Sequence, residues 1–474
     1  MTRSAAAPAG QGAVRDGGSA PLLAASRVGT LSEPARSAWT TYLERSRRLA
    51  ALDRSAMDAE LRAAGLARMT RAPYARAAFA LTPRMTAEWF ESDSARRIAD
   101  NVLSFQTPSG GWSKHVDLTL RPRRPGESYF AESDDWQYIA TIDNGATTSQ
   151  LRFLSRAYNG TGDHRYRDAV AKGLDYLLAA QLPNGCWPQV YPLQGGYHDA
   201  ATFNDDATVK VLEVLREVGR GAQGELRFVP VAVADRARGA LGLGVECLVA
   251  SQVVVNGRPT AWGQQHDPIT LAPVGARSYE LVSLSGRESA GIVDFLMGLS
   301  SPDSQVVAAV HAAIDWFRTT AIYGYSYDVE TGLRQQDGAG PIWARMSEIG
   351  TNRPIFSNRD GVRRYDWNEL TDRRTGYAWY TDEPAGVLRK YERWSARHPR
   401  AATSRRGAAV PLSSRGGVAP LSSRGAQRRG TYHAAPVANH RWRTVGPSGL
   451  PGPRDDIVRV SGPSHTMLVR GVSA

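Results

Sequence analysis

Apolar residues recur at helical spacing over most of the chain. Leu151, Leu154 and Tyr158 would share one face of a helix. The same spacing is found in two neighbouring sets, Tyr166, Val170, Leu174 and Leu177, and Val211, Leu212, Leu215 and Val218. These stretches begin near residue 37 and alternate with Gly- and Pro-rich loops as far as residue 391, whereas strand-like runs such as 227–234 are short and isolated. The pattern predicts an all-α domain with little β structure.

A Gln-x-x-x-Gly-x-Trp motif recurs between these helices. It reads QTPSGGW at residues 106–112 and QLPNGCW at 181–187, and a looser copy starts at Gln252. The spacings of 75 and 71 residues exceed one helix pair of a short solenoid repeat and leave room for long functional loops. We therefore predict an incomplete α/α barrel or toroid. Trp187 is expected to pack between helices, while Trp112 could equally pack there or contact a sugar.

Composition divides the chain into three segments. Residues 1–35 are predicted to be a disordered N-terminal segment, 36–400 the toroid, and 401–474 a disordered, low-complexity tail in which PLSSRG occurs twice. Of the net charge of +12, the tail carries +9 through eleven arginines and two aspartates, so the first 400 residues carry only +3. The toroid is therefore not expected to bind nucleic acid.

The cysteine count and the apolar runs set further limits. Cys186 and Cys247 could form one bridge if their repeat copies touch, but two reduced, buried thiols are the expected state. No run of about 18 apolar residues exists, so no membrane span is expected. The first 30 residues lack the apolar region of a signal peptide behind a basic start.

Acidic residues precede three predicted helices, each downstream of a motif copy. They are Asp143 beside Asn144, Asp205 and Asp206, and Glu288. Each could simply cap its helix, because Asp and Asn accept hydrogen bonds from the free N–H groups of a first turn. Equivalent loops of a toroid can also converge on one side, where clustered carboxylates would favour Ca²⁺ or Mg²⁺. No EF-hand loop is present.

A second set of candidates consists of arginines in loops rich in Gly, Pro and aromatic residues. These are Arg277, Arg345, Arg353 and Arg359, the last followed by Asp360. Single arginines are usually solvated or paired with surface acids. Guanidinium groups also bind carboxylates in a bidentate manner, and aromatic rings stack on sugars, so this set predicts binding of an anionic sugar.

Seven segments together resemble the family 10 pectate lyases. They lie in the order of that family between residues 103 and 394 and read QTPSGGWSK, TIDNGATTSQLRFL, AQLPNGCWPQVYP, TFNDDAT, RPTAWGQQHDP, ARSYELVSLSGRES and WARMSEIGTNRPIFSNRDG. The resemblance implies an α/α toroid that cleaves polygalacturonate by Ca²⁺-assisted β-elimination. It also implies a secreted or periplasmic protein, since a cell cannot import the polymer whole. We expect a monomer with no membrane partner.

The resemblance also implies roles for individual residues. Asp143 would bind calcium with Asn144 alongside, joined by an aspartate of the Asn-Asp-Asp segment, Asp205 being preferred over Asp206. The carboxylates of the substrate would be held by a set of basic residues, namely Arg277, Arg345, Arg353 and Lys114. Arg359 would be the base that removes the C5 proton. Because a free arginine has a pKa above about 12, that role would require burial beside other cations.

The sequence departs from the family at several positions and leaves two other functions open. Ser113, His115 and Asn358 replace residues that are common in the family, as does the Met346–Ser347 pair, and these changes affect expected sugar contacts more than the elimination. One alternative is a catalytically degenerate uronate-binding protein. The other is a triterpene-cyclase-like α/α barrel, which shares the Gln-x-x-x-Gly-x-Trp motif, but the arginine set does not suit an apolar cavity.

Overall fold

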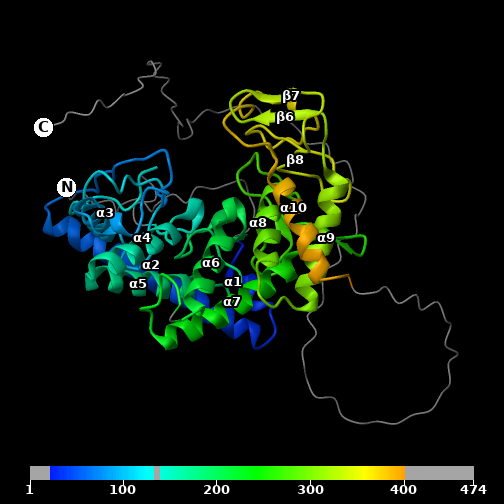
Figure 1. Ribbon diagram of the computed structural model, residues 1–474. Coiled ribbons are helices and arrows are strands. Elements are labelled where there is room, and N and C mark those ends of the chain that lie inside the picture. Colours follow the sequence, from blue (N-terminus) through cyan, green and yellow to red (C-terminus); the bar gives the residue numbers. More distant parts are fainter. Residues whose placement is uncertain (1–21, 133–138, 222, 401–474) are drawn as a thin grey trace, which may run out of the picture. The chain divides into compact units, whose positions relative to one another are not determined.

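Three helical hairpins in series form the body of the protein. The computed structural model describes residues 22–132, 139–221 and 223–400. The hairpins pair α4 (Thr148–Thr161) with α5 (His164–Ala180), α6 (Ala207–Gly219) with α7 (Val231–Ser251), and α8 (Gly286–Met297) with α9 (Ser304–Thr320). Helices α4, α6 and α8 contact one another in turn, and so do α5, α7 and α9, which gives two rows of helices (Figure 1). The predicted α/α toroid is confirmed.

Further helices lie at the ends of these rows. α3 (Asp93–Ser104) packs on α4 and α5, and α10 (Glu383–Arg397) packs on α8 and α9. α3 and α10 lie at opposite ends of the two rows (Figure 1), so the toroid is incomplete, as predicted. The short 3₁₀ turns are η1 (Glu88–Glu91), η2 (Asp143–Gly145), η3 (Gly196–Asp199), η4 (Asn204–Asp206) and η5 (Trp367–Glu369).

The strands are short and belong to the loops. The antiparallel groups are β1 (Ala201–Thr202) with β4 (Gln265–His266) and β5 (Pro273–Val274), β2 (Val254–Val255) with β3 (Arg258–Pro259), β6 (Tyr325–Asp328) with β7 (Gly332–Gln335), and β8 (Trp343–Ala344) with β9 (Tyr380–Thr381). The strand-like run at 227–234 is not a strand, because Pro230 ends the preceding turn and Val231 begins α7. Proline is well suited to the position before a helix.

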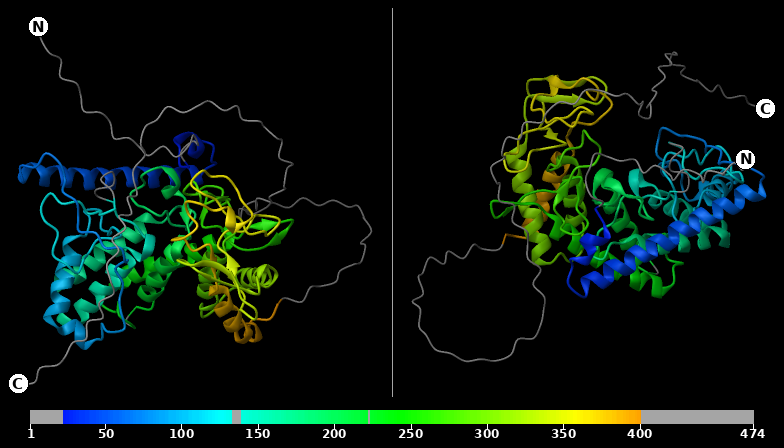
Figure 2. Two further views of the ribbon diagram at one scale, coloured as in Figure 1. Left: turned by 90° about the horizontal axis from the view of Figure 1, so that it is seen from above. Right: turned by 180° about the vertical axis from the view of Figure 1, so that it is seen from behind.

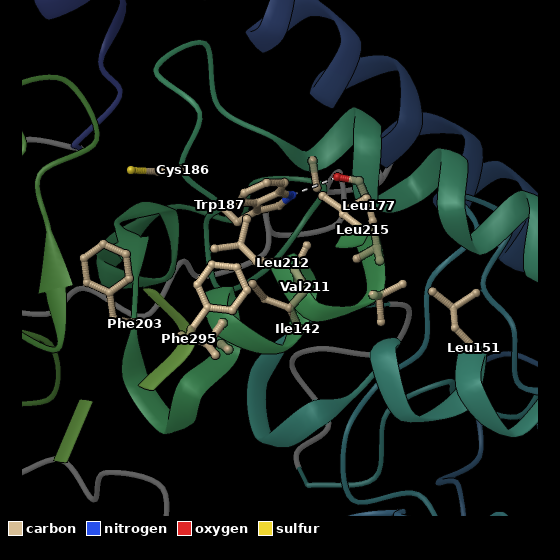
Figure 3. Packing of buried hydrophobic residues seen from close by; sticks show 14 of the residues in the cluster. Ile142, Leu151, Leu177, Cys186, Trp187, Phe203, Val211, Leu212, Leu215 and Phe295 are labelled. Atoms are coloured by element: carbon tan, nitrogen blue, oxygen red, sulfur yellow. Dashed lines mark hydrogen bonds between the residues drawn. The ribbon is translucent and has the colours of Figure 1, made fainter. Parts of the chain in front are cut away.

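The tryptophan of each repeat closes the end of the preceding helix. The Trp187 indole N–H donates to the Leu177 carbonyl at 2.8 Å within a buried apolar cluster (Figure 3). Equivalent bonds join Trp112 to Val102, Trp262 to Leu248, and Trp343 to Phe317. All four rings are buried, so Trp112 packs between helices and does not contact a sugar. Trp343 marks a fourth copy that the motif did not predict.

The two cysteines form a disulfide, so the expectation of two reduced thiols is wrong. Cys186 and Cys247 are bonded, with Cα atoms 5.4 Å apart. The reason is a close contact between the second motif loop and α7: the Gln181 side chain donates to the Ala240 carbonyl, and a Cβ on Gly185 would lie 2.1 Å from the Leu243 carbonyl oxygen. This contact brings Cys186 against the helix that carries Cys247.

The N-terminal part of the chain is helical from residue 25. α1 (Ala25–Gly29) and the long α2 (Ala35–Ala63) pack together (Figure 2), and Leu23 and Val28 are buried. Residues 22–35, predicted as disordered from their composition, are therefore part of the fold. Residues 1–21 and the predicted tail 401–474 lie outside the described residues. No helix of the described ranges is long and apolar enough to cross a membrane.

Helix α2 is held to the first motif loop by a buried carboxylate. Asp53, 1% exposed, accepts a hydrogen bond from the Ser109 amide at 2.7 Å, and its second oxygen has no partner among the described residues. Burial outweighs this bond and raises the pKa of Asp53 to about 6. Because the folded-state pKa exceeds the unfolded value, the native state loses stability as the pH rises from about 4 to about 6.

We therefore expect Asp53→Asn to stabilise the protein at pH 8 by about 1–3 kcal/mol, with little effect at pH 4. The amide side chain keeps an acceptor for Ser109 but carries no charge. Urea denaturation of both proteins at the two pH values measures the difference in their free energies of unfolding. Other titrating groups are the same in both proteins, so their contributions cancel in this difference. A wild type that is the more stable of the two at pH 8 would show that the ionised carboxylate is needed.

A second, smaller core lies near the C-terminal end of the rows. It contains Tyr279, Ile355, Phe356, Tyr377 and Trp379 together with neighbouring apolar residues. Strands β6 to β9 belong to this lobe, which carries or adjoins all four candidate arginines. The toroid supplies the acidic turns and the lobe supplies or adjoins the four candidate arginines. The candidate site is therefore expected where the toroid and the lobe meet.

Candidate functional site

The acidic turns η2 and η4 are copies of one another. Asn144 and Asp205 occupy the same position in each and have nearly the same left-handed backbone, with φ of 49° and 50°. The same hydrogen bond closes both turns. The Thr147 hydroxyl donates to the Thr141 carbonyl in the first, and the Thr208 hydroxyl donates to the Thr202 carbonyl in the second. Left-handed conformations of residues other than glycine are strained and are concentrated at functional sites. Neither α4 nor α6 has a side-chain cap, so helix capping does not explain these acids.

The two turns meet in the structure. The Asn144 amide nitrogen lies 3.3 Å from an Asp205 carboxylate oxygen. Next to it, Asp143 is buried and accepts a hydrogen bond from the Lys114 ammonium at 2.7 Å; Glu132 lies 3.5 Å from the same ammonium. Burial lowers the pKa of Lys114, but Asp143 and Glu132 outweigh it and raise the pKa overall. Lys114 is thus a permanent cation beside the two turns.

Arginines neutralise Asp205 from the other side. Arg287 forms an ion pair with Asp205, and Arg345 lies 3.3 Å from it and 2.9 Å from Glu288. Burial alone would raise the pKa of Asp205, but Arg345 and Arg287 lower it to about 2. Arg345, predicted to hold a substrate carboxylate, is 5% exposed and lies against Asp205 and Glu288. Arg287 was not anticipated, although it directly precedes Glu288 in the third acidic segment.

Asp206 points away from this meeting point. One of its carboxylate oxygens is buried and has no hydrogen-bond partner among the described residues. The same oxygen packs closely against Gly291 of α8, where an added Cβ would lie only 2.0 Å from it. Burial, reinforced by Glu288, raises the pKa of Asp206 to about 6. The neighbouring aspartates therefore differ in kind: Asp205 is ionised among cations, and Asp206 is packed against α8. This difference favours Asp205 as the acid that faces a ligand.

The described residues contain no group of three or more acidic, histidine or cysteine side chains that could hold a metal by themselves. They do offer the Asp205 carboxylate next to the side-chain amide of Asn144, with the Asp143 carboxylate in the same turn as Asn144. Hard oxygen donors of this kind suit Ca²⁺, which takes six to eight oxygen ligands, some of them from water or substrate. Asp143, Asn144 and Asp205 are therefore the described residues that could hold a calcium ion, with further oxygen ligands from water or from a bound carboxylate.

The remaining arginines lie in different surroundings. Arg277 is exposed and forms a bidentate ion pair with the buried Glu280; partial burial works against the charged form, but this pairing raises the pKa of Arg277 overall. Arg353 is exposed and stacks on Tyr365 at 3.8 Å. Arg359 is exposed, and its backbone N–H donates to Asp372 at 3.1 Å. Arg353 and Arg359 are thus not buried beside other cations, and of the four arginines of the second candidate set Arg345 is the buried one.

Arg277 lies near the acidic turns. On its own, the charge of Arg277 would lower the pKa values of Tyr197 and His198, and the charges of Lys114 and Asp143 also act on these two side chains. Burial together with the Lys114 and Arg277 charges lowers the pKa of His198 to about 3, so this imidazole is neutral at physiological pH. Four basic residues, Lys114, Arg277, Arg287 and Arg345, therefore surround the region of the two turns or act on it electrostatically.

Residues 106–388 match the sequence profile described as pectic acid lyase. Among solved structures, a family 10 polysaccharide lyase from Cellvibrio cellulosa is 34% identical, with a TM-score of 0.58, over 67% of this chain and 98% of that one. A mutant of that lyase in complex with trigalacturonic acid is also 34% identical, with a TM-score of 0.58, over 66% of this chain and 99% of that one. No curated protein matches the chain.

Proposed function

The chain belongs to the pectic acid lyase family, and from this premise we propose that it cleaves α-1,4-linked polygalacturonate by calcium-assisted β-elimination. It is a polysaccharide lyase. The observation that carries the finer proposal is the meeting of Asn144 and Asp205 within a ring of fixed cations. Such a centre attracts a uronate carboxylate and can accept a metal ion next to it.

In this proposal each side chain has a defined task. Asn144 and Asp205, with Asp143 beside them, would hold Ca²⁺, which supplies charge stabilisation to the uronate carboxylate. Lys114 and Arg345 would contribute further positive charge, because removal of the proton α to a carboxylate builds up negative charge on its oxygens. Their ion pairs hold them in position before substrate arrives.

The elimination itself requires a base at C5. The base removes the C5 proton, the electron pair forms the C4–C5 double bond, and the C4–O bond breaks, so that the departing chain leaves with its oxygen and takes up a proton from water. This gives a 4,5-unsaturated end. Arg359 was predicted as the base, and its side chain is exposed, as is that of Arg277. We propose Arg277 in its place, because its bidentate pair with the buried Glu280 fixes the guanidinium and its charge acts on Tyr197 and His198, as do those of Lys114 and Asp143.

We expect the ultraviolet absorbance of the unsaturated product to rise when the protein is mixed with polygalacturonate and calcium, and to stop rising when a chelator is added. Calcium should restore the rate, and Asp205→Asn should need at least about tenfold more calcium for half-maximal rate, since a charged ligand is lost. Asp206→Asn is the matched control and should change this requirement little.

Other outcomes would point to different functions. A rate insensitive to chelator would remove calcium from the proposal. A flat trace with retained binding of polygalacturonate would identify a degenerate uronate-binding protein. We further propose that the protein acts outside the cytoplasm as a monomer. The Cys186–Cys247 disulfide supports this location, because such bonds persist mainly in oxidising compartments.

A further inference from the structure

An arginine outside the predicted set lies between two tyrosines of the C-terminal lobe. The guanidinium carbon of Arg373 is 4.5 Å from the Tyr279 ring centre and 5.6 Å from that of Tyr377. Its terminal nitrogen donates to the Tyr279 hydroxyl at 3.3 Å. The Trp379 indole donates to the Arg373 carbonyl at 2.7 Å, which fixes the backbone. The aromatic rings hold this cation in one place and leave its charge intact.

Arg373 lacks the acidic partner that several neighbouring arginines have. Arg277 is paired with Glu280, Arg345 with Glu288, and Arg363 and Arg364 with Glu348 and Asp360, respectively. No carboxylate of the described residues lies within ion-pair distance of Arg373, and its Nε is buried without a hydrogen-bond acceptor. An unsatisfied buried donor on a charged group is costly, so an anionic ligand that supplied acceptors would be bound favourably.

Two aromatic rings connect Arg373 to the candidate site. The Tyr377 ring also contacts Arg345, whose guanidinium carbon lies 4.9 Å from its centre. The Tyr279 ring contacts Arg277 in the same way, also at 4.9 Å. Arg373 is therefore one ring removed from each of the two arginines that flank the proposed elimination centre. Because it is half-buried, part of its side chain remains open to solvent.

We propose that Arg373 binds the carboxylate of a galacturonate unit adjacent to the one that reacts, and so makes the enzyme prefer chains whose neighbouring unit is not methyl-esterified. This inference rests on the proposed cleavage of polygalacturonate. A methyl ester has no negative charge and cannot form the charge-assisted, bidentate contact that an arginine offers. Arg373 thus acts in substrate selection and takes no part in the proton transfer.

The test compares Arg373→Ala with Arg374→Ala on pectins of increasing esterification. Arg374 is the matched control, since it too stacks on an aromatic ring, that of Trp367 at 4.3 Å, and bonds only to Asn368. For Arg373→Ala we expect kcat/KM on unesterified polygalacturonate to fall about 10- to 100-fold. The loss should shrink to less than about threefold on highly esterified pectin. Arg374→Ala should match the wild type throughout.

Each result decides the question. An equal loss on all pectins, or no loss on polygalacturonate, would overturn the proposal, and inactivity of the wild type would instead refute the proposed function. If Arg373→Ala does not fold, Arg373→Lys serves, because it keeps the charge but loses the bidentate geometry and should show an intermediate dependence on esterification. Calorimetric titration with trigalacturonate should give weaker binding for Arg373→Ala and unchanged binding for Arg374→Ala.

Discussion

Replacing Arg277 by lysine is expected to lower kcat on polygalacturonate by about 10³-fold, the range found for loss of a general base. Arg359→Lys should lower it no more than about tenfold. Lysine keeps the positive charge, so ground-state attraction of the uronate is preserved while the position of the accepting nitrogen changes. The expected difference follows from location: both side chains are exposed, but Arg277 is fixed by the buried Glu280 and its charge acts on Tyr197 and His198 beside the acidic turns.

The dependence on pH adds a second measurement. Only the unprotonated base accepts a proton, and pairing with Glu280 raises the pKa of Arg277, so kcat should increase with pH throughout the neutral and alkaline range. Arg374→Lys is the control for a general effect of replacing an arginine in this lobe. A larger loss in Arg359→Lys than in Arg277→Lys would reinstate Arg359 as the base. Small losses in both would mean that another group accepts the proton.

Removing the Cys186–Cys247 disulfide should destabilise the protein by about 4 kcal/mol. The bond closes a loop of 61 residues, and closing a loop of that length restricts the unfolded chain by about this amount. The double variant Cys186→Ala and Cys247→Ala is the suitable one, because both side chains are buried and serine would bring in unpaired hydroxyl groups. Urea denaturation of the variant and of the oxidised wild type gives the difference.

Reduction of the wild type provides the control for this experiment. Wild type unfolded and refolded in reductant should approach the stability of the double variant, and reductant should leave the variant unchanged. A loss below about 1 kcal/mol would mean that the second motif loop remains fixed to α7 by its other contacts, such as the Gln181 bond to Ala240. Activity per folded molecule should stay close to that of the wild type, since the bond touches none of the proposed catalytic side chains.

The helices could be predicted because their burial is periodic. Leu151 and Leu154 point into one core, and Tyr166 and Val170 into the same core from the next helix. A run such as RFVPVAVA carries no such period, and its β-branched residues resemble a strand until Pro230 is considered as a helix start. The disulfide could not be predicted because it depends on the distance between two repeats, which periodicity does not determine.

The site could be predicted only in part, for a similar reason. Asp143, Asn144 and Asp205 stand out because acids recur before equivalent helices, and the structure brings these turns together. Arg287 and Arg373 carry no such signal, since a single arginine in a loop is common. Whether an arginine pairs with an acid, as Arg277 does with the buried Glu280, or packs on aromatic rings without an acidic partner is decided by tertiary contacts.

The indole bonds that close each helix have a consequence for the loops between them. The sequence separation between the tryptophan and the threonine at the start of the following turn differs between repeats. It is 29 residues in the first repeat (Trp112 to Thr141) but only 15 in the second (Trp187 to Thr202). Both turns nevertheless have the same geometry, so loop length is uncoupled from the position of the turn. The segment between these two points can therefore lengthen or shorten without moving the acidic turn, and the longer one uses its extra reach to supply Lys114 to the elimination centre.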